Sequence, residues 1–358
     1  MKFDLKTPPN GTVRDWLNYR EKQHGNKIAF TFLDGSSPIS WTELEAKSRK
    51  LANQLTYNNI QKGESVAIMH ENGRNAIEAL FGVLYGGFRA TLINLLAGDT
   101  AINYALEHCD ARVALVGDDQ EAQFKRVRPK SINMFSQINT QVVVNLHHLG
   151  AEDEALLMYT SGTTGKPKGV IHTHASLLAG GWTPTIAHKL TNNDCGLCVL
   201  PIYHINGLCV TIMGTLISGG SLAVAKRFSA SNFWKQCEIS EITWFSVVPT
   251  IISHLLNSQL EPSKSTIARL RFGRSASSAL APDVQKTFEN RFGTQIVETM
   301  GLTETAAQIL SNPLFPALRK IGSSGIPFGN KACILSPGMR KLPANRQGEI
   351  AVRGANIM

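Results

Sequence analysis

The sequence predicts an α/β protein with two doubly wound, mostly parallel sheets and a small β-rich unit. Short apolar runs alternate with segments of helical periodicity along most of the chain, which is typical of parallel strands joined by helices. A length of 358 residues exceeds what one hydrophobic core usually fills, so at least two subdomains are expected. From residue 321 onward, short strands separated by Gly and Pro turns replace the alternation.

The first α/β subdomain is assigned to residues 1–185. It should begin with a helix at 12–22, a strand hairpin at 28–40 and a helix capped by Thr42. Buried strands are then expected within 66–69, 90–94 and 111–117, with helices at 75–85 and 100–109. Residues 118–141 are polar and aperiodic, which predicts a surface connection.

The second α/β subdomain is assigned to residues 186–320. We expect strands within 195–201, 221–225, 242–249, 270–275 and 294–302, and helices at 207–218, 231–238, 250–258 and from Pro282 onward. The apolar run 207–218 is too short to span a membrane, and a buried core helix explains it better. Residues 321–358 are expected to start a small β-barrel-like subdomain.

The composition narrows the class of protein. With 43% hydrophobic and 18% charged residues the chain is an ordinary globular one, without a membrane span or a visible secretory signal. The six cysteines lack the spacing of a disulfide framework, which fits the cytoplasm, and the lone Cys195-x-x-Cys198 pair is read as thiols rather than a zinc site. The net charge of +9 is scattered, so anionic substrates explain it better than nucleic acid.

The stretch from Leu156 to Val170, LLMYTSGTTGKPKGV, predicts a phosphate loop that follows a buried strand. Glycines allow a close approach of the backbone to an anion, hydroxyls and successive N–H groups donate to it, and lysines offset its charge. The spacing differs from that of the Walker A pattern. The candidate phosphate-binding residues are Thr160, Ser161, Gly162, Thr163, Thr164, Gly165, Lys166 and Lys168.

Three further stretches lie where a ligand would sit in an open sheet, at predicted strand ends. The first, from Pro201 to Leu208, carries His204 beside a Gly turn. The second contains Ala276, whose small neighbours leave room for a flat ring against the backbone. In the third, TQIVETMGLTET, a carboxylate could hold Mg²⁺ and a hydroxyl could face a phosphate. For His172 and His174 an ordinary place at a helix start is favoured.

Together these motifs resemble the signatures of the adenylate-forming superfamily, which includes acyl-CoA synthetases, luciferases and peptide-synthetase adenylation domains. The resemblance covers nearly the whole chain and identifies it as the large N-terminal domain of such an enzyme. It implies that the loop holds the β- and γ-phosphates of ATP. It also places adenine against the small-residue turn, whose usual Gly-Ala-Ala-Pro-Leu is altered here, and against Met300, where an aromatic residue is usual. For Met300, the alternative is that it is an ordinary methionine of the hydrophobic core that does not contact adenine.

The implied roles divide into three groups. The catalytic residues are Thr303, Glu304 and Lys166, with Glu304 as the Mg²⁺ ligand. Beyond the loop, the residues assigned to ATP binding are Ala276, Ser277, Ser278, Glu298, Thr299, Met300 and Gly301. The acid substrate is assigned to His204, Asn206, Gly207, Trp244, Ser246 and Arg274.

The implied reaction is ATP-dependent activation of a carboxylic acid to an acyl-adenylate, followed by transfer to coenzyme A. The blocks FSASNFW, ITWFSVVPTI and RFGRSASSAL are closer to small-acid CoA ligases, such as oxalate–CoA ligase, than to long-chain ligases. Arg274 could hold a second anionic group of the acid, and a structural ion pair is an equal alternative.

Other functions remain open. An adenylation domain that loads a carrier-protein thiol would usually have Phe-Asp where this chain has Tyr203-His204. A nucleotide-binding fragment with weak turnover is the second alternative, and a luciferase-like oxygenase has no distinguishing feature. The ribose-binding Asp and the C-terminal catalytic Lys of relatives lie outside these 358 residues, so we expect the chain alone to be poorly active.

Overall fold

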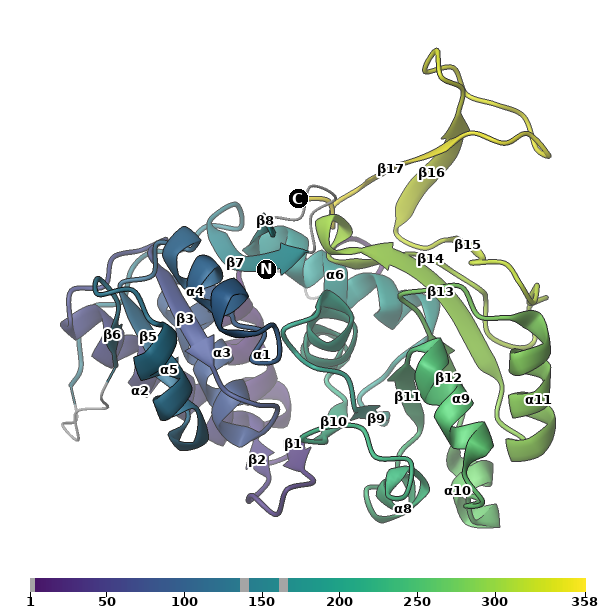
Figure 1. Ribbon diagram of the computed structural model, residues 1–358, viewed down its shortest axis with the longest axis horizontal. Helices are drawn as coiled ribbons and strands as arrows, with labels where there is room; N and C mark the ends of the chain where they lie inside the picture. Colours follow the sequence, from purple (N-terminus) through teal and green to yellow (C-terminus); the bar gives the residue numbers. More distant parts are fainter. Residues whose placement is uncertain (1–3, 136–141, 161–166) are drawn as a thin grey trace.

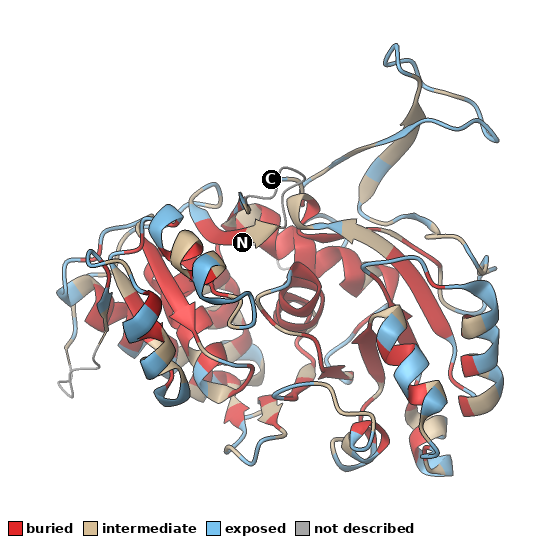
Figure 2. Cartoon of the chain, in the orientation of Figure 1, coloured by how far each residue is buried: buried red, intermediate tan, exposed pale blue. Residues whose placement is uncertain are grey.

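The computed structural model describes residues 4–135, 142–160 and 167–358, which are arranged in alternating layers of helices and sheets (Figure 1). A central core joins the inner faces of the two large sheets through the helices between them. One separate core lies under the outer helices of each sheet. Buried residues concentrate in the strands and the central helices (Figure 2), so the expected α/β fold is confirmed.

The first large sheet has six strands in the order β6-β5-β3-β4-β7-β8. They are β3 (Ser65–Met69), β4 (Arg89–Leu92), β5 (Val113–Val116), β6 (Asn133–Met134), β7 (Glu154–Thr160) and β8 (Lys168–Thr173). All pairs are parallel except β7 with β8. Every residue of β3 is buried, which explains its continuous apolar run. The outer face carries α4 (Asp99–His108) and α5 (Glu121–Val127), with the short η1 (Asp118–Gln120) before α5.

The second sheet has nine strands in the order β15-β14-β13-β12-β11-β9-β10-β1-β2. They are β1 (Ile28–Phe32), β2 (Ile39–Ser40), β9 (Cys195–Cys198), β10 (Ser221–Val224), β11 (Trp244–Val247), β12 (Phe272–Ser275), β13 (Ile296–Leu302), β14 (Ala307–Ser311) and β15 (Ile326–Pro327). The helices in the connections between β10 and β14 are α8 (Phe233–Ile239), α9 (Pro249–Asn257), α10 (Lys264–Arg269), α11 (Pro282–Phe292) and the short η3 (Thr303–Thr305).

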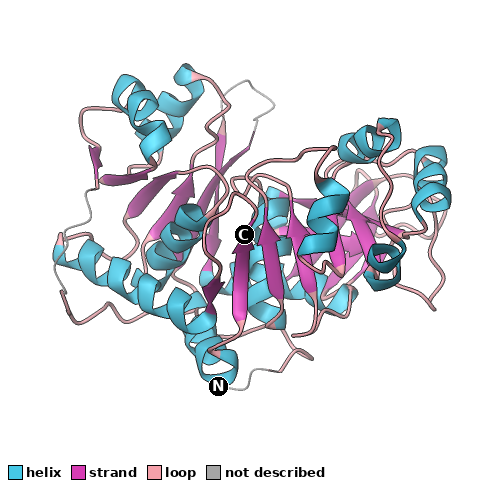
Figure 3. Ribbon diagram, turned by 90° about the horizontal axis from the view of Figure 1, so that it is seen from below, coloured by secondary structure: helices cyan, strands magenta, loops and turns pink. Residues whose placement is uncertain are grey.

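The layer between the sheets is helical, and Figure 3 shows both sheets flanking it. It contains α1 (Val13–His24), α2 (Trp41–Tyr57), α3 (Arg74–Gly86), α6 (His174–Ala187), the π-helical η2 (Asn206–Met213) and α7 (Gly214–Ser218). The expected burial of the run 207–218 is confirmed, since η2 is buried throughout. Helix α1 begins where Thr12 and Asp15 cap each other's backbone N–H groups.

The two sheets share one topological feature. In the first, the chain runs from β3 to its neighbour β4 and then crosses to β5 on the other side of β3. In the second, it runs from β9 to β10 and then crosses to β11 on the other side of β9. The carboxyl ends of β3 and β5, and those of β9 and β11, are therefore topological switch points, where open sheets leave a crevice for ligands.

Several expectations need correction. The hairpin 28–40, assigned to the first subdomain, pairs with β10 and so belongs to the nine-stranded sheet. Residues 118–141 include helix α5 and strand β6, and the two buried side chains of α5 were too few to give a period. Helix α10 and strand β14 were also missed.

The C-terminal unit also differs from the expectation. Strands β16 (Asn330–Leu335) and β17 (Glu349–Gly354) form a two-stranded ribbon that projects from the molecule (Figure 1). No closed barrel forms within residues 321–358, because two strands cannot close a sheet on itself.

Two general observations complete the fold. Along the described ranges, no helix combines the length and the apolar character needed to cross a membrane. All six cysteines of the chain fall in those ranges and are free, as expected for thiols. Cys195 and Cys198 both lie on β9, and the described His, Cys, Asp and Glu side chains form no cluster of three or more that could hold a metal ion.

Candidate active site

A cleft of about 740 Å³ lies at the switch point of the nine-stranded sheet. Its walls come from the segments that follow four parallel strands of that sheet and from the β7–β8 hairpin of the other sheet. The lining residues are Thr160, Lys168, Leu200, Pro201, His204, Ile205, Asn206, Val248, Ser277, Gly301, Leu302, Thr303 and Glu304. The cleft thus joins residues of the phosphate loop, the His204 segment, the small-residue turn and the third motif.

One wall of the cleft is framed by Thr160 and Lys168, which face each other across β7 and β8. Because this hairpin carries the predicted phosphate loop, we call it the phosphate hairpin. The loop residues between them that the sequence singles out, Ser161, Gly162, Thr163, Thr164, Gly165 and Lys166, lie outside the described residues. Both stems of the hairpin contact α4. The Tyr104 hydroxyl donates to the Pro167 carbonyl over 3.3 Å, and His108 Nδ1 lies 2.9 Å from the Tyr159 hydroxyl.

The third motif ends β13 and turns through η3 into β14. A Cβ at Gly301 would lie 1.7 Å from the Ala307 carbonyl oxygen, so only glycine permits this close return of the chain. Thr303 and Glu304 then line the cleft, both half-buried.

Histidine 172 ties this motif to the phosphate hairpin. Its Nε2 lies 2.7 Å from the Thr303 carbonyl oxygen, which can only accept, so Nε2 is the donor. Burial lowers the pKa of His172, which keeps the ring neutral and suited to this bond. Both histidines expected at a helix start are buried, but His172 lies in β8 and only His174 begins α6.

The small-residue turn follows β12. Ala276 is buried, whereas Ser277 and Ser278 are exposed, and Ser277 adopts a φ of 75°. A left-handed conformation is unfavourable for serine, and strain of this kind gathers at functional sites. Met300 is half-buried on β13, beside the buried Glu298 and Thr299. Glu298 Oε1 accepts from the Leu280 N–H over 3.2 Å, while its Oε2 is buried with no hydrogen-bond partner among the described residues.

His204 and Asn206, both predicted to contact the acid, line another part of the cleft, and a buried network fixes Asn206 from behind. Arg274 Nη1 donates to Asn206 Oδ1 over 2.6 Å and to Ser246 Oγ over 3.0 Å. The Asn206 amide nitrogen, in turn, donates to Ser277 Oγ over 3.3 Å. The carboxamide carbonyl therefore faces the buried arginine, and its NH₂ group faces the lining residue Ser277.

Arg274 is a buried cation without an acidic partner in the described parts of the chain. It is 1% exposed, and burial lowers its pKa to about 9, so the group stays charged at neutral pH. Its Nε donates to Gln308 Oε1 over 3.3 Å. The Gln308 oxygen also lies 3.2 Å from His188 Nε2, and burial lowers the pKa of His188 to about 3. A neutral network thus surrounds one positive charge.

Four candidate substrate residues are not on the cleft surface. Trp244 begins β11, away from the strand end that borders the cleft, and stacks on Phe272 with ring centroids 5.9 Å apart. Ser246 and Arg274 lie behind Asn206, so they can reach a ligand only through it. Gly207 is buried where η2 begins, and a Cβ there would approach the Pro201 carbonyl oxygen to within 2.4 Å.

Sequence reasoning missed three residues that support the cleft. Gln308 and His188 belong to the network around Arg274, and Asn72 holds the segment that precedes His204. Asn72 Nδ2 donates to the Leu200 carbonyl over 2.8 Å, and its Oδ1 accepts from the Ile202 N–H over 3.0 Å. None of the three stands in a motif, and no local pattern could have revealed contacts with residues 34 to 130 positions away in the sequence.

Comparison with known proteins places this geometry in a family. The chain is 37% identical over 372 residues to the sulfoacetate–CoA ligase of Cupriavidus necator, covering 99% of this chain and 72% of that protein. It is 35% identical over 237 residues to the oxalate–CoA ligase of Saccharomyces cerevisiae, covering 66% of this chain and 43% of that protein.

Solved structures agree on the fold. ATP-bound MatB from Rhodopseudomonas palustris matches with a TM-score of 0.85 and 25% identity over 98% of this chain and 71% of that chain. The anthranilate CoA ligase AuaEII, in complex with anthranoyl-AMP, matches with a TM-score of 0.86 and 22% identity, covering 100% and 71%. The model of the AMP-binding enzyme family matches residues 17–358. With the phosphate hairpin, the small-residue turn and the third motif meeting in one cleft, the chain belongs to the AMP-binding enzyme family.

Proposed function

We propose that this chain carries the adenylation site of an acid–CoA ligase that activates a small carboxylic acid. The observation that carries the proposal is the convergence of Lys168, Ser277 and Glu304, from three separate motifs, on one cleft. In the first step a carboxylate oxygen attacks the α-phosphorus of ATP and pyrophosphate leaves. In the second step a thiolate attacks the acyl carbon and AMP leaves.

The residues of the cleft suit the first step. Lys168, at the end of the phosphate hairpin, offsets the charge of the β- and γ-phosphates, and the Thr303 hydroxyl donates to the α-phosphate as charge builds on it. The bond from His172 holds the backbone of Thr303, which sets the direction of that hydroxyl. Catalysis here is positioning and charge stabilisation, and no side chain needs to act as a nucleophile.

Glu304 fits the role of a magnesium ligand. Mg²⁺ in such sites is usually held by one or two carboxylates together with substrate phosphates, so a single half-buried carboxylate facing the cleft is sufficient. The ion would neutralise phosphate charge and make the α-phosphorus more electrophilic.

The acid is proposed to be small and to carry a second anionic group. The donors offered by Asn206 and Ser277 are backed by the positive charge of Arg274, which no acid of the described residues offsets. A dianionic acid gains little from apolar burial, so its recognition must come from charge and hydrogen bonds. Support comes from two relatives, a sulfoacetate–CoA ligase and an oxalate–CoA ligase, which are named for dianionic substrates.

Coenzyme A is the proposed acceptor, since the relatives compared above are CoA ligases. The carrier-protein alternative is less favoured, because an acid that could pair with an amino-acid ammonium is missing at position 204. Such a domain would need that pairing to select its substrate.

The test is a thioester-forming assay with ATP, Mg²⁺ and coenzyme A. The panel contains sulfoacetate, oxalate, malonate, acetate, propionate, octanoate and benzoate, and AMP release is followed alongside the acyl-CoA product. The proposal predicts the highest kcat/KM for a two-carbon or three-carbon dianion. Preference for octanoate or benzoate would overturn the assignment of the acid, and formation of AMP without acyl-CoA would overturn that of the acceptor.

A further inference from the structure

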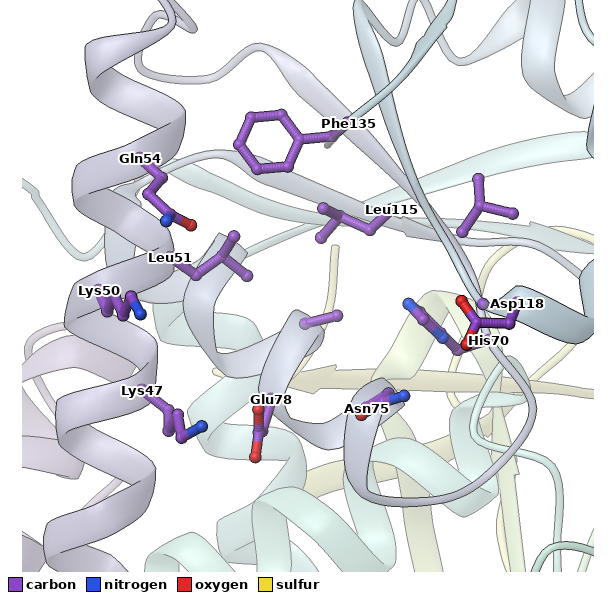
Figure 4. A pocket seen from close by; sticks show the side chains of 13 residues that line it. Lys47, Lys50, Leu51, Gln54, His70, Asn75, Glu78, Leu115, Asp118 and Phe135 are labelled. Carbon is purple, nitrogen blue, oxygen red and sulfur yellow. The ribbon is translucent and has the colours of Figure 1, made fainter. Parts of the chain in front are cut away.

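The switch point of the six-stranded sheet is also hollow. A pocket of about 250 Å³ lies where β3 and β5 end, and the inner face of α2 forms its opposite wall (Figure 4). None of its lining residues is shared with the catalytic cleft. Its position relative to β3 and β5 is that of the catalytic cleft relative to β9 and β11, which is where open sheets bind ligands.

One rim of the pocket is positively charged. Lys47 and Lys50 lie one turn apart on α2 and both face the pocket (Figure 4). Both are exposed, and the described residues give neither of them an ion-pair partner. The nearby acid Glu78 is already engaged, since Arg74 Nε lies 2.8 Å from its Oε1. The two ammonium groups are therefore available to a ligand.

Part of the interior of the pocket is apolar, although polar groups make up more of its lining. Leu51 and Leu115 are 7% and 5% exposed and project between the rims, with Phe135 above them (Figure 4). At the far end stands His70, whose pKa is lowered by burial, so its ring is neutral at pH 7. Asp118 lies beside it on the opposite side of the pocket from the lysines. A ligand with an anionic end toward α2 and an apolar body toward Leu115 matches this arrangement.

We propose that this pocket is a second ligand site, which binds a small organic anion with an apolar body, such as an aromatic carboxylate. The carboxylate lies between Lys47 and Lys50, and the ring packs on Leu51, Leu115 and Phe135. Charge-assisted contacts with two lysines orient the ligand, and the ring supplies the apolar area that a free phosphate lacks. The site is separate from the adenylation cleft, so its existence does not depend on the proposed function.

The test measures benzoate binding to the chain by ligand-observed NMR, without ATP. Two comparison ligands separate the contributions: benzyl alcohol keeps the ring without the charge, and inorganic phosphate keeps the charge without the ring. Benzoate should bind at least about tenfold more tightly than either. Equal binding of phosphate, or no saturable binding of benzoate, overturns the proposal.

Variants then locate the benzoate. Lys47→Ala/Lys50→Ala should raise its Kd about tenfold. The matched control, Lys264→Ala/Lys341→Ala, removes the same charge from two exposed lysines outside the pocket and should leave the Kd unchanged. His204→Ala changes the catalytic cleft instead, and it should also leave the Kd for benzoate unchanged. If His204→Ala weakens benzoate and the Lys47/Lys50 variant does not, the benzoate lies in the catalytic cleft and the proposal is wrong.

Discussion

The two switch points of this molecule have the same strand order and different surroundings. At the nine-stranded sheet, the β7–β8 hairpin of the other sheet closes over the strand ends and creates a cleft of about 740 Å³. At the six-stranded sheet, helix α2 lies against the strand ends and leaves about 250 Å³. Topology therefore decides where a crevice forms, and the segments that cover it decide its size and chemistry.

The two sites also differ in the charged groups that surround them. Among the described residues, the cleft has one lysine on its surface, a carboxylate at Glu304 and a buried arginine behind Asn206. The smaller pocket has two exposed lysines on its rim and an apolar part at Leu51 and Leu115, within a lining that is otherwise largely polar. Multiple fixed donors suit a triphosphate and a dianionic acid, whereas a charged rim beside an apolar part suits one amphiphilic anion. Variants that affect one site and spare the other test this division.

The largest effect is expected from the carboxylate of the cleft. Glu304→Gln should lower the adenylation rate about a hundredfold or more, because it weakens the proposed ligand of the Mg²⁺ that would offset the phosphate charge developing in the transition state. ATP binding should change much less. Acid-dependent ATP–pyrophosphate exchange gives the rate, and calorimetry gives the binding. Asp118→Asn, the matched change in the smaller pocket, should alter neither, and an equal loss in both quantities for Glu304→Gln would contradict its role.

Arg274 should affect the choice of acid. Arg274→Met should lose activity on dianionic acids by about two orders of magnitude, roughly 3 kcal/mol, because Asn206 is then no longer held or polarised by a cation. Propionate should be spared. The ratio of kcat/KM for the two acids separates specificity from a general loss. Equal loss of both in a variant that stays folded would make Arg274 purely structural.

Asn72 connects the two switch points, because it lies in the loop after β3 and bonds the segment after β9. Asn72→Ala should lower the free energy of unfolding by about 2 kcal/mol, since it leaves a buried N–H and a carbonyl unpaired. Urea denaturation measures the change. Asn75→Ala, at an exposed position in the first turn of α3, should stay within about 0.5 kcal/mol. Similar small effects for both would show that the loops are held independently.

The buried histidines near the cleft predict a pH dependence. Burial lowers the pKa of His188 to about 3 and that of His174 to about 4, so the unfolded chain binds more protons below about pH 6.5. Stability is therefore complete above pH 6.5 and falls toward pH 4, by up to about 1.4 kcal/mol per pH unit for each histidine. In urea titrations at several pH values, His188→Gln should flatten this slope. An unchanged slope would mean that His188 already binds a proton in the folded state.

The fold was largely predictable because most of the parallel strands are buried apolar runs bounded by helices, whereas the short and partly exposed β6 was missed. The hairpin 28–40 shows the limit, since its pairing with β10 joins residues almost two hundred positions apart. Helix α5 was missed because a two-turn helix with two buried side chains gives no clear period.

The sequence could indicate the residues of the site that stand in a motif. It could not indicate those whose position depends on how side chains pack. His204, Asn206, Ser277, Thr303 and Glu304 stand in motifs and all line one cleft, while their individual roles there stay predictions. Trp244, in contrast, shares a strand with residues near the cleft, but strand direction puts it at the other end. The position of Arg274 behind Asn206 depends on side chains from three elements, and a linear pattern cannot show which of them faces the solvent.

The assignment of ATP to the cleft is tested most directly by comparing ATP affinity in variants of the two sites. Lys168→Ala should raise the Kd for MgATP, measured by calorimetry, about tenfold, because it removes one charge-assisted phosphate contact. Lys47→Ala/Lys50→Ala serves as the comparison and should leave the Kd unchanged, although that variant removes twice the charge. An unchanged Kd in Lys168→Ala, or a weakened one in the Lys47/Lys50 variant, would place ATP elsewhere and contradict the assignment of the cleft.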